Sequence, residues 1–370
     1  MRYYLIAGEA SGDLHGSNLI KGLRETDPQA EFRFRGGDLM ALAAGTPPAA
    51  HYRDGALMGL TDIIANAGTL LKALKDCKKD ISEWHPDAVI LIDYPGFNLR
   101  IAEYCHNHGI CTLYYIAPKT WASREGRNEK LRTLVDKLYV VFPFEVPYFR
   151  KAGVPFEYKG NPLVDAIDSH EFNRPAEGRY IAVLPGSRKG EIKRTLPVCM
   201  EIADSLRMNF IVAGAPSMRE EDYAPLIGSR KNVRLLFGRT YDVLKYADAA
   251  IINSGTASLE AALIGTPQLV CWSTGRLTYA WARHLLKVQK HIDYISLGNL
   301  ILGREAFREF IQDDFNTAGV LAETKRLLED ADYRARMQGD YRLIRESLGG
   351  RGATQAVAAS MIETIKQHAI

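Results

Sequence analysis

The sequence has 370 residues, of which 46% are hydrophobic and 25% charged, and its formal net charge is +3. This length exceeds what one ordinary core fills, so it predicts two domains. The small net charge lacks the clustered basic excess of a dedicated nucleic-acid binder, so no nucleic-acid partner is predicted. Five scattered cysteines without a CxxC pair are typical of a protein of the reducing cytosol without a metal cage.

Short apolar runs in the first half predict buried strands of a parallel sheet: Tyr3–Ala7, Ala88–Asp93, Thr112–Ile116 and Lys137–Phe142. The first run begins near the N-terminus, which lacks the apolar length of a signal peptide. Amphipathic stretches such as Leu99–His108 predict helices between the strands. We expect a first domain over residues 1–165.

The alternation restarts after the polar stretch Asp168–Gly178. Five further runs predict the strands Tyr180–Leu184, Asn209–Ala213, Val233–Phe237, Ala249–Asn253 and Gln268–Trp272. From about Thr317 onward only helices are expected, and the last is Ala353–His368. The chain is therefore predicted to be an α/β protein with two doubly wound Rossmann-like domains and an active site in the cleft between them. The second domain covers residues 175–345, and residues 346–370 cross back to the first domain or to a partner chain.

The loop after the first strand, Gly8-Glu-Ala-Ser-Gly-Asp13, is followed by Gly16. Its glycines allow a tight turn and close approach to a ligand. Glu9 would repel a pyrophosphate, so the loop suits sugar hydroxyls or an acceptor, with Ser11 and Asp13 as further contacts. Equally, Ser11 and Asp13 are suited to cap the helix that follows.

A second loop, Asp93-Tyr-Pro-Gly-Phe-Asn98, follows the strand that starts at Ala88. A carboxylate at the carboxyl end of a strand and facing a cleft is well placed as a general base. Pro95 and Gly96 would fix its direction. The alternative role for Asp93 is to cap the helix that begins near Asn98.

Two loops of the second half predict a nucleoside-diphosphate pocket. In the first, Gly186 and Ser187 offer hydrogen-bond donors, and the guanidinium group of Arg188 is suited to bind a phosphate through two parallel hydrogen bonds. In the second, helix amides suit a phosphate and a carboxylate suits ribose hydroxyls, which assigns Ser254, Gly255, Thr256 and Glu260. A well-capped amphipathic helix accounts for the same residues of the second loop.

Two later features are less specific. Asn299 is an amide in an apolar loop, where it either satisfies the local backbone or reaches a sugar. Asp330 and Asp332 match a DxD pattern, but their charged helical surroundings indicate solvated surface. We therefore predict no metal and no other cofactor.

A basic amphipathic segment suggests a peripheral membrane contact, since no run approaches the roughly 20 apolar residues that cross a bilayer. Lys72, Lys75 and Lys79 share one helical face. They follow an apolar stretch that would rest on anionic lipid, namely Met58, Leu60, Ile63 and Ile64. A helix that covers the sheet with a solvated lysine face explains the same pattern.

Taken together, six motifs resemble bacterial lipid-A-disaccharide synthases in their order and cover nearly the whole chain. Besides the loops at Gly8 and Asp93, they are Tyr115-Ile-Ala-Pro-Lys-Thr-Trp121, Leu184-Pro-Gly-Ser-Arg188, Ser254-Gly-Thr-Ala-Ser-Leu-Glu260 and Ser296-Leu-Gly-Asn-Leu300. Any one motif is weak, but six in order are specific.

The resemblance implies a GT-B fold and an inverting, metal-independent glycosyl transfer. The donor would be UDP-2,3-diacylglucosamine, the acceptor 2,3-diacylglucosamine 1-phosphate, and the product a β-1,6-linked disaccharide. The resemblance also implies that the enzyme lies on the inner face of the cytoplasmic membrane. A homodimer is compatible with the sequence. By motif position, Asp93 matches the essential aspartate, Arg188 the phosphate-region arginine, Asn299 the loop asparagine and Glu260 the ribose-binding acid.

Three alternatives remain at this point. A UDP-N-acetylglucosamine 2-epimerase has the same architecture and needs no acceptor. A MurG-like transferase would use a lipid-pyrophosphate acceptor. A non-catalytic nucleotide-sugar sensor would bind UDP without any turnover.

Overall fold

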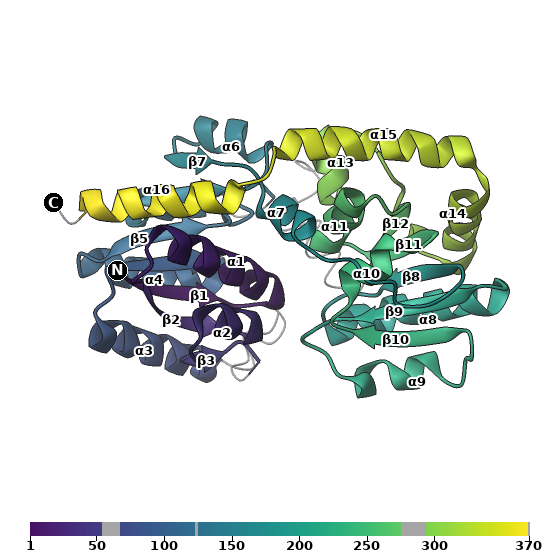
Figure 1. Ribbon diagram of the computed structural model, residues 1–370, viewed down its shortest axis with the longest axis horizontal. Coiled ribbons are helices and arrows are strands. Elements are labelled where there is room, and N and C mark those ends of the chain that lie inside the picture. The colour runs from purple at the N-terminus through teal and green to yellow at the C-terminus, as the bar shows by residue number, and fades with distance from the viewer. Residues whose placement is uncertain (54–66, 123–124, 275–293, 369–370) are drawn as a thin grey trace. The chain divides into compact units, whose positions relative to one another are not determined.

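The computed structural model describes residues 1–53, 67–122, 125–274 and 294–368, which form two compact units (Figure 1). Unit 1 comprises Met1–Asp165 and Gly350–Ile370, and unit 2 comprises Ala166–Gly349. Each unit contains its own sheet of parallel strands. The two sheets confirm the predicted class of two doubly wound α/β domains.

The sheet of unit 1 has the strand order β3-β2-β1-β4-β5-β6-β7. Its strands are β1 (Arg2–Ala7), β2 (Glu31–Gly36), β3 (Ala50–His51), β4 (Ala88–Ile92), β5 (Cys111–Tyr115), β6 (Lys137–Val140) and β7 (Phe156–Tyr158). Each described neighbouring pair is parallel. The strand order reverses between β1 and β4, so the carboxyl ends of these two strands flank a topological switch point, where ligands bind in such sheets.

Helices cover both faces of this sheet. They are α1 (Ala10–Thr26), α2 (Asp38–Ala44), α3 (Ala67–Trp84), α4 (Pro95–Asn107), α5 (Arg127–Leu134), α6 (Glu145–Lys151) and α16 (Ala353–His368), with α7 (Pro162–Asp168) at the unit boundary. Buried residues of α3, α4, α5 and α6 share one core with the strands, including Leu138 and Val140 of β6. Tyr139 alternates to the opposite face, where its hydroxyl lies 3.1 Å from that of Ser360 in α16.

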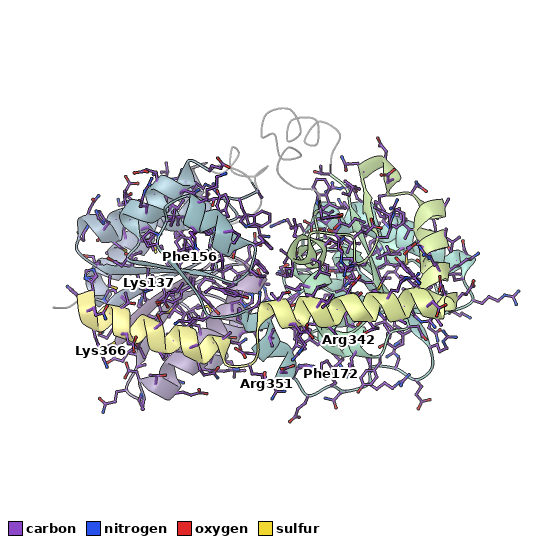
Figure 2. All side chains as sticks on the ribbon, turned by 90° about the horizontal axis from the view of Figure 1, so that it is seen from above. Lys137, Phe156, Phe172, Arg342, Arg351 and Lys366 are labelled. Carbon is purple, nitrogen blue, oxygen red and sulfur yellow. The ribbon has the colours of Figure 1, made fainter. Side chains whose placement is uncertain are left out.

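The last helix, α16, returns to unit 1 and packs along α1. Figure 2 marks its course from Arg351, just before its start, to Lys366 near its end. The Asp165 carboxylate accepts hydrogen bonds from the backbone N–H groups of Gly352 (2.7 Å) and Thr354 (2.8 Å). Asp165 therefore supplies the partners that the first turn of a helix lacks, and it fixes the start of α16.

The sheet of unit 2 has the order β10-β9-β8-β11-β12-β13, again with parallel described pairs. Its strands are β8 (Tyr180–Leu184), β9 (Asn209–Gly214), β10 (Val233–Phe237), β11 (Ala249–Asn253), β12 (Gln268–Trp272) and β13 (Glu309–Ile311). Its helices are α8 (Lys189–Ser205), α9 (Ala224–Ile227), α10 (Thr240–Lys245), α11 (Thr256–Ile264), α13 (Leu297–Leu302), α14 (Thr317–Glu329) and α15 (Ala331–Leu348). The switch point of this sheet lies between β8 and β11.

Replacing Asp165 by alanine should free the start of α16. Loss of a helix cap costs about 1 kcal/mol, so we expect faster hydrogen exchange of the α16 amides, measured by mass spectrometry. Asp76→Ala, an exposed change on α3, serves as the control. Equal exchange of α16 in the two variants would show that Asp165 does not hold the helix.

Candidate functional site

In unit 1, the loops after β1 and β4 meet at the switch point. A side chain on Gly8 would place its Cβ 2.5 Å from Cγ of Tyr94, so glycine is needed for this contact. Glu9 at the N-cap of α1 is exposed, and Ser11 is half-buried. The predicted acceptor loop therefore lies against the loop that carries Asp93.

Gly12 and Gly16, which lie inside α1, serve packing instead of ligand approach, which corrects the sequence-based interpretation. A Cβ on Gly12 would lie 3.1 Å from Cβ of Ala7, and one on Gly16 would lie 2.7 Å from Sδ of Met40. The absence of side chains lets α1 lie close to β1 and α2.

Asp13 is buried and caps a different helix from the one predicted. Its carboxylate accepts hydrogen bonds from the backbone N–H groups of Gly37 (2.8 Å), Leu39 (3.1 Å) and Met40 (3.0 Å). Asp13 itself lies in the first turn of α1 and makes no N-cap there. The expectation that it caps its own helix is therefore wrong, because its side chain reaches the start of α2.

Asp93 occupies a strained turn. Its φ is 45° and that of Tyr94 is 46°, a left-handed conformation that non-glycine residues rarely adopt. The Asp93 carbonyl accepts hydrogen bonds from the Tyr114 hydroxyl (2.5 Å) and from Nδ2 of Asn98 (2.8 Å). Each such residue costs about 1–3 kcal/mol, and strain of this kind gathers at functional sites.

The environment of the Asp93 carboxyl suits a proton acceptor. Burial raises the pKa of Asp93, the nearby Glu9 carboxylate raises it further, and Lys119 and Arg127 lower it. A base whose pKa is raised toward the working pH accepts a proton more effectively in a transition state. Asn98 is fully buried and donates to the carbonyls of Ile92 and Asp93, so in this structure it holds the turn.

In unit 2, the loop after β8 carries the predicted phosphate contacts. Gly186 has φ 115°, and Arg188 is the N-cap of α8. Both donors meet one carboxylate, that of Glu191: the Ser187 N–H lies 2.9 Å from Oε2, and NH1 of Arg188 lies 3.2 Å from Oε1. The Arg188 side chain remains 53% exposed.

The loop after β11 leads into α11. Gly255 is the N-cap, and Thr256 is the first helical residue. The Ser254 hydroxyl donates weakly to the carbonyl of Ile295, at 3.4 Å. The first amides of α11 therefore lie at the same sheet edge as Arg188, as expected for an anion site at a switch point.

Glu260 lies one turn into α11 and is half-buried. Burial raises the pKa of Glu260 to about 7, and the hydrogen bond from the Tyr241 hydroxyl (3.1 Å) counteracts this rise. The Tyr241 ring packs edge-on against His170, whose Nε2 lies 3.1 Å from the Asp242 carboxylate. The segment that precedes β8 thus supports the tyrosine that holds Glu260.

Asn299 is committed to protein contacts. Its Nδ2 donates to the carbonyl of Phe307 and to Oε1 of Glu309, both at 2.9 Å, and its Oδ1 accepts from two backbone N–H groups. Glu309 in turn accepts from the backbone N–H groups of Ile295 and Ser296. Asn299 therefore fixes the segment whose Ile295 carbonyl accepts from Ser254. In this structure its side chain satisfies the local backbone, which is one of the two roles predicted from the sequence.

Comparisons with known proteins agree over the full chain. A model of the lipid-A-disaccharide synthetase family matches residues 3–362. A lipid-A-disaccharide synthase from Geobacter metallireducens is 38% identical over 378 residues, covering 98% of this chain and 97% of the relative. One from Nitrosococcus oceani is 37% identical over 369 residues, covering 96% and 94%. The chain belongs to the lipid-A-disaccharide synthase family.

This membership makes the chain a glycosyltransferase of lipid A biosynthesis, acting on a UDP-sugar donor and an acceptor. Solved structures confirm the GT-B fold. A UDP-GlcNAc 2-epimerase from Neisseria meningitidis has a TM-score of 0.69 at 12% identity, covering 98% of this chain and 100% of its own. The glycosyltransferase SnogD from Streptomyces nogalater has a TM-score of 0.55 at 19% identity, covering 98% and 99%.

The predicted membrane residues of this family member, Met58, Leu60, Ile63 and Ile64, lie outside the described residues. The lysine face is described: Lys72, Lys75 and Lys79 are exposed on α3. Among the described helices, none combines the length and the apolar character needed to span a bilayer.

One group of potential metal ligands occurs in the described part of this enzyme, formed by Cys111, Asp136 and His368. Cys111 begins β5, whereas Asp93 follows the carboxyl end of β4, so the group lies at the other edge of the sheet. Burial raises the pKa of Cys111 to about 12, which keeps the thiol protonated and disfavours metal binding.

Sequence reasoning missed three side chains that support the site: Tyr114, Glu191 and Tyr241. Glu191 carried a signal, since a glutamate in the first turn of a helix commonly reaches back to the preceding backbone. The two tyrosines lie in a buried strand and in a short helix, where no spacing distinguishes a supporting hydroxyl from an ordinary core ring.

UDP affinity should depend on the ionisation of Glu260 if this residue binds ribose. Because the pKa of Glu260 is about 7, the carboxyl is mostly protonated at pH 6 and ionised at pH 8. An ionised carboxylate accepts both ribose hydroxyls, so affinity should weaken as the pH falls through 7.

Calorimetric titration of wild type and Glu260→Gln with UDP between pH 6 and 8 measures this dependence. The difference between the two proteins removes the titration of the phosphate itself. Parallel pH profiles would exclude Glu260 from the nucleotide site.

Proposed function

We propose that the enzyme transfers the glucosamine unit of UDP-2,3-diacylglucosamine to 2,3-diacylglucosamine 1-phosphate, forming a β-1,6 bond with inversion and releasing UDP. Family membership supports the reaction class. The observation that supports the catalytic assignment is Asp93, held in a strained turn at the switch point of unit 1 with its pKa raised by burial.

In this proposal, unit 1 binds the acceptor and unit 2 binds the donor. The acceptor 6-hydroxyl oxygen attacks the anomeric carbon, and Asp93 takes its proton. The bond between that carbon and the β-phosphate oxygen breaks, and its electron pair leaves with UDP. Arg188 and the first amides of α11 stabilise the growing negative charge without a metal or other cofactor.

In the proposal, some of the other predicted residues contact a substrate directly and others act through the backbone. Glu9 and Ser11 border the acceptor, Gly186 and Ser187 line the diphosphate, and Glu260 accepts the ribose hydroxyls. Asp13, Asn98 and Asn299 act through the backbone that they hold, because the Asp13 carboxylate, Nδ2 of Asn98 and the Asn299 amide are hydrogen-bonded to backbone groups.

Asp93→Asn should lower kcat by about 10² to 10⁴, the usual contribution of a general base. UDP affinity and thermal stability should stay near the wild-type values, since asparagine keeps the volume and the turn. UDP release in a coupled assay gives kcat, and Asp76→Asn is the control for the loss of one carboxylate. A kcat within a few-fold of wild type would remove Asp93 from the role of base.

The same assay separates the alternative functions. The proposed transferase releases UDP from UDP-diacylglucosamine only when the acyl sugar phosphate is present. An epimerase changes UDP-GlcNAc without an acceptor, a MurG-like transferase requires a lipid pyrophosphate, and a sensor shows no turnover with any of them.

We also propose that the enzyme rests on the inner face of the cytoplasmic membrane through the lysine face of α3. Lys72, Lys75 and Lys79 are exposed there, and the neighbouring Leu71 is 66% exposed. Exposed lysines beside an exposed leucine suit an anionic lipid surface, which also presents the acylated substrates.

Reversing the charge of these three lysines to glutamate should abolish most binding to anionic vesicles, because each lysine near such a surface contributes about 1 kcal/mol. Vesicle co-sedimentation measures the loss. The matched control reverses three dispersed exposed lysines, Lys231, Lys325 and Lys366. An equal loss in both triple variants would indicate that only net charge matters and would reject the α3 face.

A further inference from the structure

Glu191 lies in the first turn of α8 with both carboxylate oxygens engaged. Oε2 accepts from the Ser187 N–H at 2.9 Å, and Oε1 accepts from NH1 of Arg188 at 3.2 Å. The side chain folds back over Gly186, where an added Cβ would lie 2.6 Å from Oε2. The Glu191 side chain is only 19% exposed.

These contacts define a small anion site that is filled by the protein's own carboxylate. A backbone N–H before a helix, an arginine and a missing Cβ are the features by which loops bind phosphate. The same Ser187 amide and Arg188 guanidinium are the groups that the proposed function assigns to the diphosphate of the donor.

We propose that Glu191 is a resident anion of the donor cradle, which occupies the cradle in the empty enzyme and is displaced when the diphosphate of UDP binds. This inference rests on the proposed function. A carboxylate and a phosphate within hydrogen-bond distance of one arginine repel each other, so the two anions compete for it.

Other contacts hold the loop backbone and the neighbouring charged side chains, so the Glu191 side chain is the part that moves when the diphosphate binds. The Ser187 carbonyl accepts from the Ser217 hydroxyl at 3.1 Å, which fixes the loop backbone independently of Glu191. The neighbouring charges are paired elsewhere: Lys189 with Asp222 at 2.9 Å, and Arg194 with the carbonyl of Ser273 at 3.1 Å. Departure of the carboxylate therefore exposes a cradle that is already shaped.

The consequence concerns nucleotide exchange. A resident anion partners the Ser187 N–H and the Arg188 guanidinium when the site is empty, and it weakens UDP binding by the free energy needed to displace it. Competition of this kind favours release of the product UDP after the transfer.

Glu191→Gln tests the inference, because glutamine still accepts from the Ser187 N–H but carries no charge to compete with phosphate. The variant should bind UDP about fivefold more tightly, as expected for the loss of an exposed ion pair. Isothermal titration calorimetry measures this Kd. Glu191→Ala, which removes the side chain altogether, should shift the Kd in the same direction.

Glu201→Gln, on the same helix but far from the loop, controls for the loss of one negative charge and should leave the Kd unchanged. Thermal unfolding confirms that each variant is folded. Unchanged or weaker UDP binding by both Glu191 variants would overturn the inference.

Arg188→Ala separates this result from a failure of the proposed function. If that variant binds UDP as tightly as wild type, the assignment of the donor cradle is wrong. If it binds UDP more weakly, the cradle is confirmed, and the Glu191 variants then decide the role of the resident carboxylate.

Discussion

The left-handed turn at Asp93 and Tyr94 is the constraint on which the proposed catalytic half depends. A buried parallel strand directs its next residue toward the switch point, and both residues of the turn adopt an unfavourable positive φ. The Tyr114 hydroxyl and the Asn98 amide both bind the Asp93 carbonyl, so they offset this strain. Tyr94 then packs on Gly8, which joins the acceptor loop to the same turn.

The two units share one strand arrangement but carry different side chains at the loops of its switch point. In each sheet, the first and fourth strands of its series lie side by side, and their loops share the switch point. In unit 1 these loops carry acids, Glu9 and Asp93. In unit 2 they carry Arg188 and the amides of α11. The proposed division of labour between proton acceptor and diphosphate cradle thus follows from the residues that occupy equivalent loops.

Most strands were predictable from sequence, including the edge strand β10, whereas β2, β3, β7, β13 and the supporting contacts were not. β1, β4 and β8 are continuous apolar runs because helices cover both of their faces. β2 alternates buried and exposed residues, and β3 has only two residues, so neither forms such a run. The loop residues were predicted because they follow strands. The Asp13 carboxylate satisfies backbone groups of another helix, which no local spacing reveals, whereas satisfaction of the local backbone was one of the two roles predicted for Asn299.

Burial shifts the pKa values of the two proposed carboxylates in the same direction, and the groups next to each carboxylate determine the size of the shift. Burial raises the pKa of Asp93 and of Glu260 alike. For Asp93 the rise favours proton uptake in the proposed role, and Lys119 and Arg127 oppose the rise. For Glu260 the rise opposes binding of ribose hydroxyls, which need an ionised acceptor, and the Tyr241 hydroxyl counteracts it. Both proposed roles require an ionised carboxylate, so the cations near Asp93 and the Tyr241 hydroxyl beside Glu260 act in the same way: each limits the rise in pKa that burial causes.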